Sequence, residues 1–345
     1  MVTFPHSGPE LTTVATDYVV VHEGADVRRH DGLRPDTAYE IEGFELRTLP
    51  EPGELLATFA TMNDVHFGET SCGVISGTDI GPVFSTQPGE DPYPEVMNRG
   101  AVAEVTALDP PLVLVKGDLT STGSRDEYDR FLDMYQGAFD GRLVHVRGNH
   151  ESYHELDAAA WPTQQVDLPG VRVAVLDTSR ARRANGGVSA EQAEWLDELA
   201  RTSDRPVLVF GHHHAWNVDF EGERPHDYFG IVPDDSDRLV EVVARRPSIV
   251  GYFAGHTHRN RVRRFRATGT VPFVEVACVK DYPGAWAEYR VHEGGILQIF
   301  HRIATPEALE WTEKTRHMYE GGYADYAFGR LDERCFVIDT DRAAG

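Results

Sequence analysis

The sequence is poor in cysteine and contains no long apolar run. Cys72, Cys278 and Cys335 are too few and too widely spaced to cross-link 345 residues, and no CxxC pair indicates a thiolate metal site. This cysteine usage is typical of a reducing compartment, so we expect a cytoplasmic protein. No run of about 18 apolar residues is present, and the first residues lack the basic, then apolar pattern of a secretory leader. We therefore expect neither a membrane span nor secretion.

Basic residues are also scarce relative to acidic ones. The chain has 33 Lys and Arg against 56 Asp and Glu, which leaves a formal charge of −23. A surface of this sign repels nucleic-acid backbones and anionic lipid, so we expect neither nucleic acid nor a membrane as a partner. With 41% hydrophobic and 26% charged residues, the composition is that of a folded globular protein. These features favour a soluble enzyme with a small-molecule substrate.

The first part of the chain is rich in short β-like runs. Residues 18–22 and 39–46 are each expected to form a strand, and Gly24 and Gly32 mark turns between such runs. We predict a small β-rich N-terminal appendage over residues 1–50 that covers an edge or face of the main domain.

From residue 55 the pattern changes to strand, loop and helix, repeated. The strands are near-continuous apolar runs, which are typical of strands buried on both faces. Ser124 with Glu127, and Ser189 with Gln192, form capping boxes that predict helix starts. A third helix is expected near residues 235–245. The predicted strands are 55–61, 112–116, 143–147, 171–177, 206–211 and 249–254.

These elements predict an α/β main domain over residues 51–305. Residues 67–93 are rich in Gly, Pro and Ser and form a long loop after the first buried strand, and loops of this length are often functional. Residues 306–345 are expected to form a C-terminal extension with a helix (306–319) and a strand (334–339). We expect this extension to act as a lid or as a contact in a homodimer.

Polar residues follow directly after five of the predicted strands. In a layered α/β sheet the carboxyl ends of parallel strands share one edge, so these distant segments are expected to meet there. The five clusters are Asn63-Asp64-Val65-His66, Gly117-Asp118-Leu119-Thr120, Gly148-Asn149-His150-Glu151, Gly211-His212-His213-His214 and Gly255-His256-Thr257-His258.

The residue types in these clusters indicate metal chemistry. Carboxylates, imidazoles and an amide carbonyl without a thiolate suit Mn, Fe, Zn or Co. Residues two apart in an extended segment point the same way. Asp64 with His66, and His256 with His258, are therefore expected to converge on a pair of metal ions spaced by roughly 3.5–4 Å. Asp118 has two carboxylate oxygens and is able to bridge both ions.

The five motifs, in this order, resemble the calcineurin-like metallophosphoesterase superfamily. The pattern D-x-H, G-D, G-N-H-[D/E], H, G-H-x-H covers residues 64–258. The resemblance implies a four-layer α/β fold in which a central β-sandwich of mixed sheets is flanked by helices. It also implies two divalent or transition metal ions as cofactors, with Mn, Fe or Zn as candidates. By this resemblance the first ion is held by Asp64, His66, Asp118 and His258, and the second by Asp118, Asn149, His212 and His256.

The resemblance also implies roles for the neighbouring residues. His150 stands outside the metal shell, contacts phosphate and protonates the leaving oxygen, and Glu151 supports it. His212 is favoured over His213 as a ligand because it follows the strand directly, but both stay open. His213 and His214 are expected either to line the pocket or to serve packing.

Further residues resemble the class III cyclic nucleotide phosphodiesterase branch. They include Gly117-Asp118-Leu-Thr-x-x-Gly with the following Glu127-Tyr128, and the helix that contains Trp195. Ala215 departs from this branch, in which proline usually follows the histidine run. The implied reaction is hydrolysis of a small phosphodiester, of cyclic nucleotide or glycerophosphodiester type, by a hydroxide held between the ions. The alternatives are a phosphomonoesterase or nucleotidase and a non-catalytic metal-binding scaffold.

Overall fold

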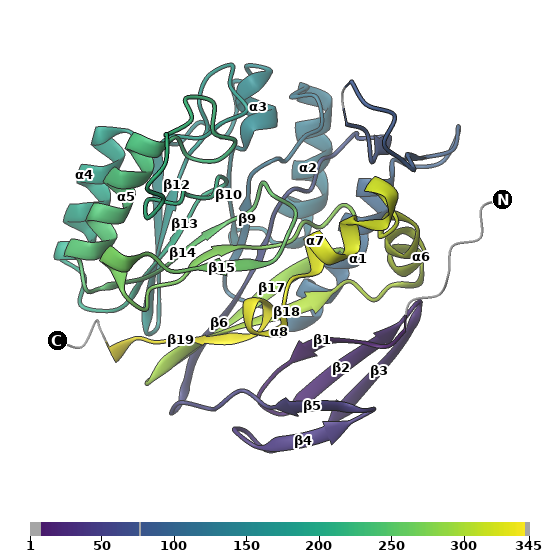
Figure 1. The fold of residues 1–345 in the computed structure, drawn as a ribbon, viewed down its shortest axis with the longest axis horizontal. Coiled ribbons are helices and arrows are strands. Elements are labelled where there is room, and N and C mark those ends of the chain that lie inside the picture. Colours follow the sequence, from purple (N-terminus) through teal and green to yellow (C-terminus); the bar gives the residue numbers. More distant parts are fainter. Residues whose placement is uncertain (1–7, 76, 342–345) are drawn as a thin grey trace.

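Two six-stranded sheets packed face to face form the centre of the computed structural model, which describes residues 8–75 and 77–341 (Figure 1). The first sheet has the order β10-β9-β6-β17-β18-β19, and the second has the order β11-β12-β13-β14-β16-β15. β6, β9 and β10 are parallel to one another, as are β12, β13, β14 and β16. Their carboxyl ends therefore form common edges.

The bounds of the sheet strands lie close to those expected from the apolar runs, and β14 has the same bounds. The first sheet contains β6 (Leu55–Met62), β9 (Val113–Lys116), β10 (Leu143–Val146), β17 (Ala285–His292), β18 (Gly295–Arg302) and β19 (Phe336–Ile338). The second contains β11 (Thr163–Leu168), β12 (Val171–Leu176), β13 (Val207–Phe210), β14 (Ile249–Ala254), β15 (Arg261–Arg263) and β16 (Phe273–Glu275).

The space between the sheets is filled by apolar side chains from both. Phe59 stacks on Tyr289 with ring centroids 4.7 Å apart, and Phe210 stacks on Phe253 at 5.1 Å. These four rings belong to one buried cluster that fixes the separation of the sheets. The strand ends of the two sheets are therefore held in fixed positions relative to one another.

Helices cover the outer faces of both sheets. α1 (Tyr93–Leu108) and α2 (Arg125–Ala138) pack on the first sheet, and α4 (Ala190–Arg201) and α5 (Pro233–Arg245) pack on the second. Both predicted capping boxes are present, at Ser124 and at Ser189. This layered arrangement confirms the predicted fold class. The short helix α3 (Asn149–Tyr153) follows β10.

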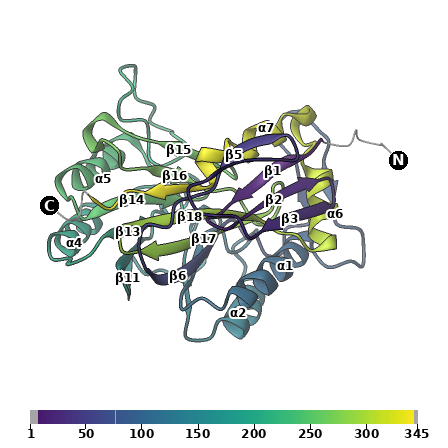
Figure 2. The same ribbon diagram turned by 90° about the horizontal axis from the view of Figure 1, so that it is seen from below.

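The N-terminal segment forms its own small sheet, which covers the outer face of β17 and β18 (Figure 2). It contains β1 (Glu10–Val14), β2 (Tyr18–Glu23) and β3 (Asp26–Asp31), and Thr13 Oγ1 donates to the carbonyl of Phe300 at 2.8 Å. The single strand predicted over 39–46 is wrong: a hairpin of β4 (Ala38–Ile41) and β5 (Phe44–Arg47) is present. Glu42 and Gly43, with φ of 51° and 82°, turn the chain between them.

The C-terminal segment packs against the main domain and adds a strand to it. α6 (Pro306–Thr315) packs against α1, and β19 adds an edge strand to the first sheet. Between them lie η2 (Tyr319–Gly321), α7 (Tyr323–Phe328) and α8 (Leu331–Arg334). The long loop after β6 carries the short strands β7 (Ser71–Cys72) and β8 (Phe84–Ser85), and η1 (Arg266–Thr268) follows β15. Within residues 8–75 and 77–341, no helix is both long and apolar enough to cross a membrane.

Candidate metal centre

The seven residues predicted as ligands lie at the ends of five strands. Asp64 and His66 follow β6, Asp118 follows β9, and Asn149 opens the helix after β10. The other three follow strands of the second sheet, His212 after β13, and His256 and His258 after β14.

Five of these residues have a left-handed backbone. Their φ angles lie between 47° and 69°, a region that costs a non-glycine residue roughly 1–2 kcal/mol. Such conformations persist only where the surroundings impose them, and they gather at functional sites. The five are Asp64, His66, Asp118, His256 and His258.

Close approach of the loops also requires glycine at two positions. A Cβ at Gly255 would lie 2.6 Å from Asp64 Oδ2, and one at Gly148 would collide with the Asp118 carboxylate. Side chains at these positions would push the carboxylates out of the centre. The amides beside these glycines also orient the acids, because His256 N donates to Asp64 at 3.0 Å and His150 N donates to Asp118 Oδ1 at 3.0 Å.

One group of ligand atoms gathers around Asp64. The side chains of Asp64, His66 and His258 offer atoms that all lie within 4.8 Å of one another. His258 Nε2 is 3.4 Å from Asp64 Oδ1. Asn63 Nδ2 donates to Asp64 Oδ2 at 2.5 Å and thereby fixes the second oxygen.

A second group gathers around His212. Its Nε2 lies 3.1 Å from Asn149 Oδ1 and 3.3 Å from Asp118 Oδ2, while its Nδ1 donates to the carbonyl of Lys116 at 2.8 Å. That bond orients Nε2 toward the acids. His256 belongs to the same region, and its Nε2 bonds to the carbonyl of Phe229 at 2.8 Å.

Asp118 connects the two groups. Its Oδ2 lies 3.5 Å from His66 Nε2 in the first group and 3.3 Å from His212 Nε2 in the second. Asp118 is 2% exposed, so its charge must be balanced by groups inside the site.

Neighbouring acids raise the pKa values of two imidazoles in this centre. Burial and Lys280 oppose protonation of His66, but Glu69 and Asp118 outweigh them and raise its pKa to about 10. Burial also opposes protonation of His212, but Asp118 raises its pKa to about 9. The same pairs hold the pKa of Asp118 well below its usual range, against the effect of burial. Cations other than protons would compete for the same positions.

The unpaired imidazole nitrogens fit metal ions. His66 Nε2 is buried and makes no hydrogen bond within the described part of the chain, whereas His66 Nδ1 lies 2.8 Å from Glu69 Oε2. The separations of 3.3–3.5 Å to Asp118 exceed ordinary hydrogen bonds, which leaves the acid and the imidazoles facing a common point. Carboxylate, imidazole and amide oxygen are a suitable donor set for transition metals.

His150 lies at the open side of the centre. Its side chain is 32% exposed, its Nδ1 bonds to the carbonyl of Ser121 at 2.6 Å, and its Nε2 is 3.9 Å from Asp118 Oδ2. Glu151, which was predicted to support His150, has hydrogen-bond partners in the two neighbouring loops. Glu151 is fully buried, and its two oxygens accept from Thr120 and from Gly148 N, so it fastens the loop after β10 to the loop after β9.

His213 and His214 are buried beside the second group. His213 Nδ1 bonds to Thr178 Oγ1 at 2.9 Å, its Nε2 makes no hydrogen bond in the described region, and its ring centroid is 4.6 Å from that of His256. His214 Nε2 bonds to Tyr228 at 2.7 Å.

Several residues near the centre were not predicted from the sequence. Glu69, Lys280 and Asp281 lie behind the histidines of the first group, and Phe229, 55% exposed, stacks on His256 at 4.0 Å. Lys116 is fully buried, and burial lowers its pKa to about 7. The sequence offers one signal for these residues: Lys116 ends an apolar strand directly before the G-D motif.

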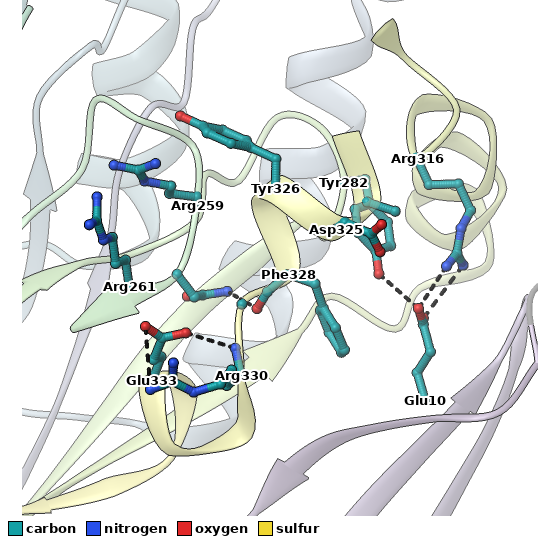
Figure 3. Close-up of a pocket in the computed structure, with 13 residues that line it drawn as sticks. Glu10, Arg259, Arg261, Tyr282, Arg316, Asp325, Tyr326, Phe328, Arg330 and Glu333 are labelled. Carbon is teal, nitrogen blue, oxygen red and sulfur yellow. Dashed lines mark hydrogen bonds and ion pairs between the residues drawn. The ribbon is translucent and has the colours of Figure 1, made fainter. Parts of the chain in front are cut away.

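A pocket of about 520 Å³ opens beside the loop that follows His258 (Figure 3). Arg259 and Arg261 stand at one end, and Arg316 is paired with Glu10 at the other, 2.6 Å apart. α7 crosses the pocket between them and carries Tyr326 toward Arg259.

The chain is similar to known phosphoesterases. The family model for calcineurin-like phosphoesterase matches residues 57–260. A probable cyclic nucleotide phosphodiesterase of Synechococcus sp. is 26% identical over 155 residues, which cover 44% of this chain and 58% of that protein. The glycerophosphodiester phosphodiesterase GpdQ of Enterobacter lignolyticus is 27% identical over 184 residues, covering 49% and 64%. The chain thus spans less than two thirds of either relative.

A solved structure supports the fold. The dimetal phosphatase from Danio rerio LOC 393393 matches with a TM-score of 0.53 and 18% identity, over 72% of this chain and 98% of that one. At this identity the match establishes the architecture alone.

Proposed function

The chain belongs to the calcineurin-like phosphoesterase family, and we propose that it is a hydrolase that uses two metal ions to cleave small phosphodiesters. The observation that carries this proposal is the position of Asp118. One of its oxygens faces an imidazole nitrogen of each ligand group, at 3.5 Å from His66 and 3.3 Å from His212. A single carboxylate shared in this way is suited to bridge two cations.

The proposed ligands divide into two sets that share Asp118. His212 is preferred to His213 because its Nε2 faces both Asp118 and Asn149, whereas His213 Nδ1 is engaged by Thr178. The donor set favours Mn, Fe or Zn. The first set is Asp64, His66, Asp118 and His258, and the second is Asp118, Asn149, His212 and His256.

Bound ions would supply Lewis acidity toward the phosphoryl oxygens and lower the pKa of a water molecule held at the centre. The chain itself fixes the geometry. Asp64 and Asp118 are held by backbone amides and by Asn63, so they are preorganised before substrate arrives. Burial of these acids excludes bulk water from their inner side.

His150 is the proposed proton donor. The Ser121 carbonyl fixes the hydrogen on Nδ1, and Nε2 faces the partly open side of the centre near Asp118. A phosphoester bound there would be within reach of Nε2. In the imidazolium form, which carries a hydrogen on each nitrogen, His150 would donate a hydrogen bond from Nε2 to the phosphoryl group, pass that proton to the leaving oxygen and be left neutral with its hydrogen on Nδ1.

A small diester is the proposed substrate class, by similarity to relatives named as cyclic nucleotide and glycerophosphodiester phosphodiesterases. Phe229 gives this centre an exposed aromatic surface, since it is 55% exposed and stacks on His256. Such a surface suits the organic group of an ester. A cytoplasmic location is part of the proposal, which the buried free thiols of Cys72, Cys278 and Cys335 support.

The test is hydrolysis of bis(p-nitrophenyl) phosphate and p-nitrophenyl phosphate by protein loaded with Mn²⁺, Fe²⁺ or Zn²⁺. We expect metal-dependent turnover with the diester preferred, followed by turnover of a 3′,5′-cyclic nucleotide or a glycerophosphodiester. Preference for the monoester would indicate a phosphomonoesterase or nucleotidase instead. Metal-loaded protein that cleaves neither ester would indicate a scaffold, and equal activity without metal would contradict the mechanism.

A further inference from the structure

A buried polar network lies behind the two histidines of the first ligand group. His66 and His258 turn their Nε2 atoms toward the centre, and each Nδ1 faces a further carboxylate. His66 Nδ1 is 2.8 Å from Glu69 Oε2, and His258 Nδ1 is 3.9 Å from Asp281 Oδ2. Each ring is thus placed between an acid of the centre and an acid behind it.

Lys280 joins the two outer acids. Its Nζ lies 2.8 Å from Glu69 Oε1 and 3.4 Å from Asp281 Oδ2, and the residue is 5% exposed. Burial opposes its charge, but Glu69 and then Asp281 outweigh burial and hold the pKa of Lys280 well above its usual range. Lys280 is one of only three lysines in the chain, with Lys116 and Lys314. Burying three charges is costly unless they are paired, as they are here.

Hydroxyl and thiol donors occupy the remaining oxygens. Tyr93 donates to Glu69 Oε1 at 2.6 Å, while Tyr323 and Cys278 donate to Asp281 Oδ1 at 2.5 Å and 2.9 Å. Lys280 binds the same Glu69 oxygen as Tyr93. Glu69 Oε2 therefore faces His66, while Asp281 Oδ2 faces both Lys280, at 3.4 Å, and His258, at 3.9 Å.

We propose that Glu69 and Asp281 are positioning residues for the first metal ion. Glu69, 2.8 Å from His66 Nδ1, holds that imidazole with the proton on Nδ1 and the lone pair of Nε2 directed at the ion, and it increases the basicity of Nε2. Asp281, 3.9 Å from His258 Nδ1, is beyond hydrogen-bond distance and favours the same orientation of His258 through its charge. This inference rests on the proposed function, because it concerns the same centre. It also accounts for the close grouping of His258, Cys278 and Asp281. In this interpretation Asp281 orients the imidazole of His258, and the three residues do not form a further metal site.

The C-terminal segment completes this arrangement. Tyr323 of α7 binds Asp281, and Tyr326, one turn later, donates to the carbonyl of Thr257 at 3.0 Å. Thr257 stands between the two histidines of the G-H-x-H motif. Arg259 lies over the ring of Tyr326 at 5.0 Å and holds it there (Figure 3). α7 therefore supports both the loop that carries His258 and the acid behind it.

The test measures Mn²⁺ binding by the full chain with Asp281→Asn and with Glu69→Gln. Electron paramagnetic resonance counts free and bound Mn²⁺, and elemental analysis gives the stoichiometry. We expect one of the two ions to bind about 10–100-fold more weakly, with the other unchanged, and the Mn²⁺ spectrum of the bound pair to be altered. Hydrolysis should recover at high Mn²⁺ concentration.

The matched control is Glu288→Gln. Glu288 is also a buried acid paired with a histidine, since it lies 2.9 Å from His301 Nε2, but it lies within β17 and belongs to neither ligand group. This variant should lose stability and keep both Mn²⁺ affinities. If an outer-acid variant proves unfolded, Tyr323→Phe removes a single hydroxyl, and a several-fold loss of affinity for one ion is expected.

Unchanged Mn²⁺ affinities in folded Asp281→Asn and Glu69→Gln, or in Tyr323→Phe where those do not fold, would overturn the inference. Equal weakening of both ions would overturn it as well. A wild-type protein that binds two Mn²⁺ ions but cleaves no phosphoester would overturn the proposed function alone, since the affinities still decide the inference. A wild-type protein that binds no Mn²⁺ would overturn both.

Discussion

In two buried regions of this protein, the charge of an acidic side chain is balanced in different ways. Under the N-terminal sheet, Glu288 is paired on both oxygens, with Arg290 Nε at 2.6 Å and His301 Nε2 at 2.9 Å. At the strand ends, Asp118 faces imidazole nitrogens at 3.3–3.5 Å, and His66 Nε2 makes no hydrogen bond within the described chain. The first region is satisfied by its own side chains, whereas the second has the form of a receptor for cations.

The backbone differs in the same way. Glu288 lies within the regular antiparallel strand β17, while Asp64 and Asp118 have left-handed φ angles. A charge that only stabilises the fold can sit in relaxed structure. Acids that must converge on one point require a strained backbone at these residues, and the packing of the two sheets offsets the cost of that strain.

The largest change expected is for Asp118→Ala. Loss of the shared carboxylate should remove most of the bound metal and reduce hydrolysis of bis(p-nitrophenyl) phosphate by about 10³-fold or more. Elemental analysis and initial rates, with circular dichroism to verify folding, measure this effect. A variant that kept two ions would show that Asp118 resembles Glu288 in being merely structural.

His150→Ala separates chemistry from metal binding. We expect both ions to be retained and kcat to fall by about 10²–10⁴-fold, because only the proton donor is lost. Rates and metal content of the same sample give the result. Loss of an ion would instead place His150 among the ligands.

When metal is removed, we expect protons on His66 and His212 to balance the charge of the acids in its place. The folded-state pKa values of His66 and His212, raised to about 10 and about 9, lie above their ordinary value of 6.5. The stability that these protons contribute is fully present below about pH 6.5 and is lost as the pH rises through 9–10.

With a chelator present, the thermal midpoint should therefore fall between pH 6.5 and 10, and added Mn²⁺ should restore it most at the upper end. Thermal unfolding with EDTA and with Mn²⁺ measures both curves. Parallel curves would mean that Mn²⁺ does not replace these protons.

Glu288→Gln should affect activity least. We expect it to lower the free energy of unfolding by about 1–3 kcal/mol at pH 7 and to leave kcat within about twofold. Burial opposes ionisation, but the hydrogen bond from His301 lowers the pKa of Glu288 to about 2. Its stabilisation is therefore present above about pH 4.5 and lost as the pH falls toward 2, so the variant and wild-type curves should converge in acid. Urea unfolding at pH 7 and pH 3 tests this.

The sequence predicted the strand ends well because two independent signals coincide there. Buried strands such as β14 are near-continuous apolar runs, and polar residues follow them at once. The hairpin of β4 and β5 was missed because the change of phase in the alternation was overlooked: apolar residues are at 39 and 41 before the turn at Glu42 and Gly43, and at 44 and 46 after it.

The supporting network could not be predicted for another reason. Glu69 and Lys280 are 211 residues apart, and neither lies in a motif. An isolated acid or lysine in a loop has many conceivable partners, and only the folded chain selects one. Glu151 illustrates the same limit, because it is next to His150 in sequence yet binds Thr120.

The span of the centre along the chain has a consequence for biosynthesis. Its proposed ligands begin at Asp64 and end at His258, and Tyr323 of α7 contacts the acid behind His258. A nascent polypeptide lacks the last of these ligands until residue 258 has been synthesised, and it lacks the contact to Asp281 until α7 has been synthesised. We therefore expect the proposed centre to be finished only after α7 has been synthesised, and premature termination before α7 to yield a product without it.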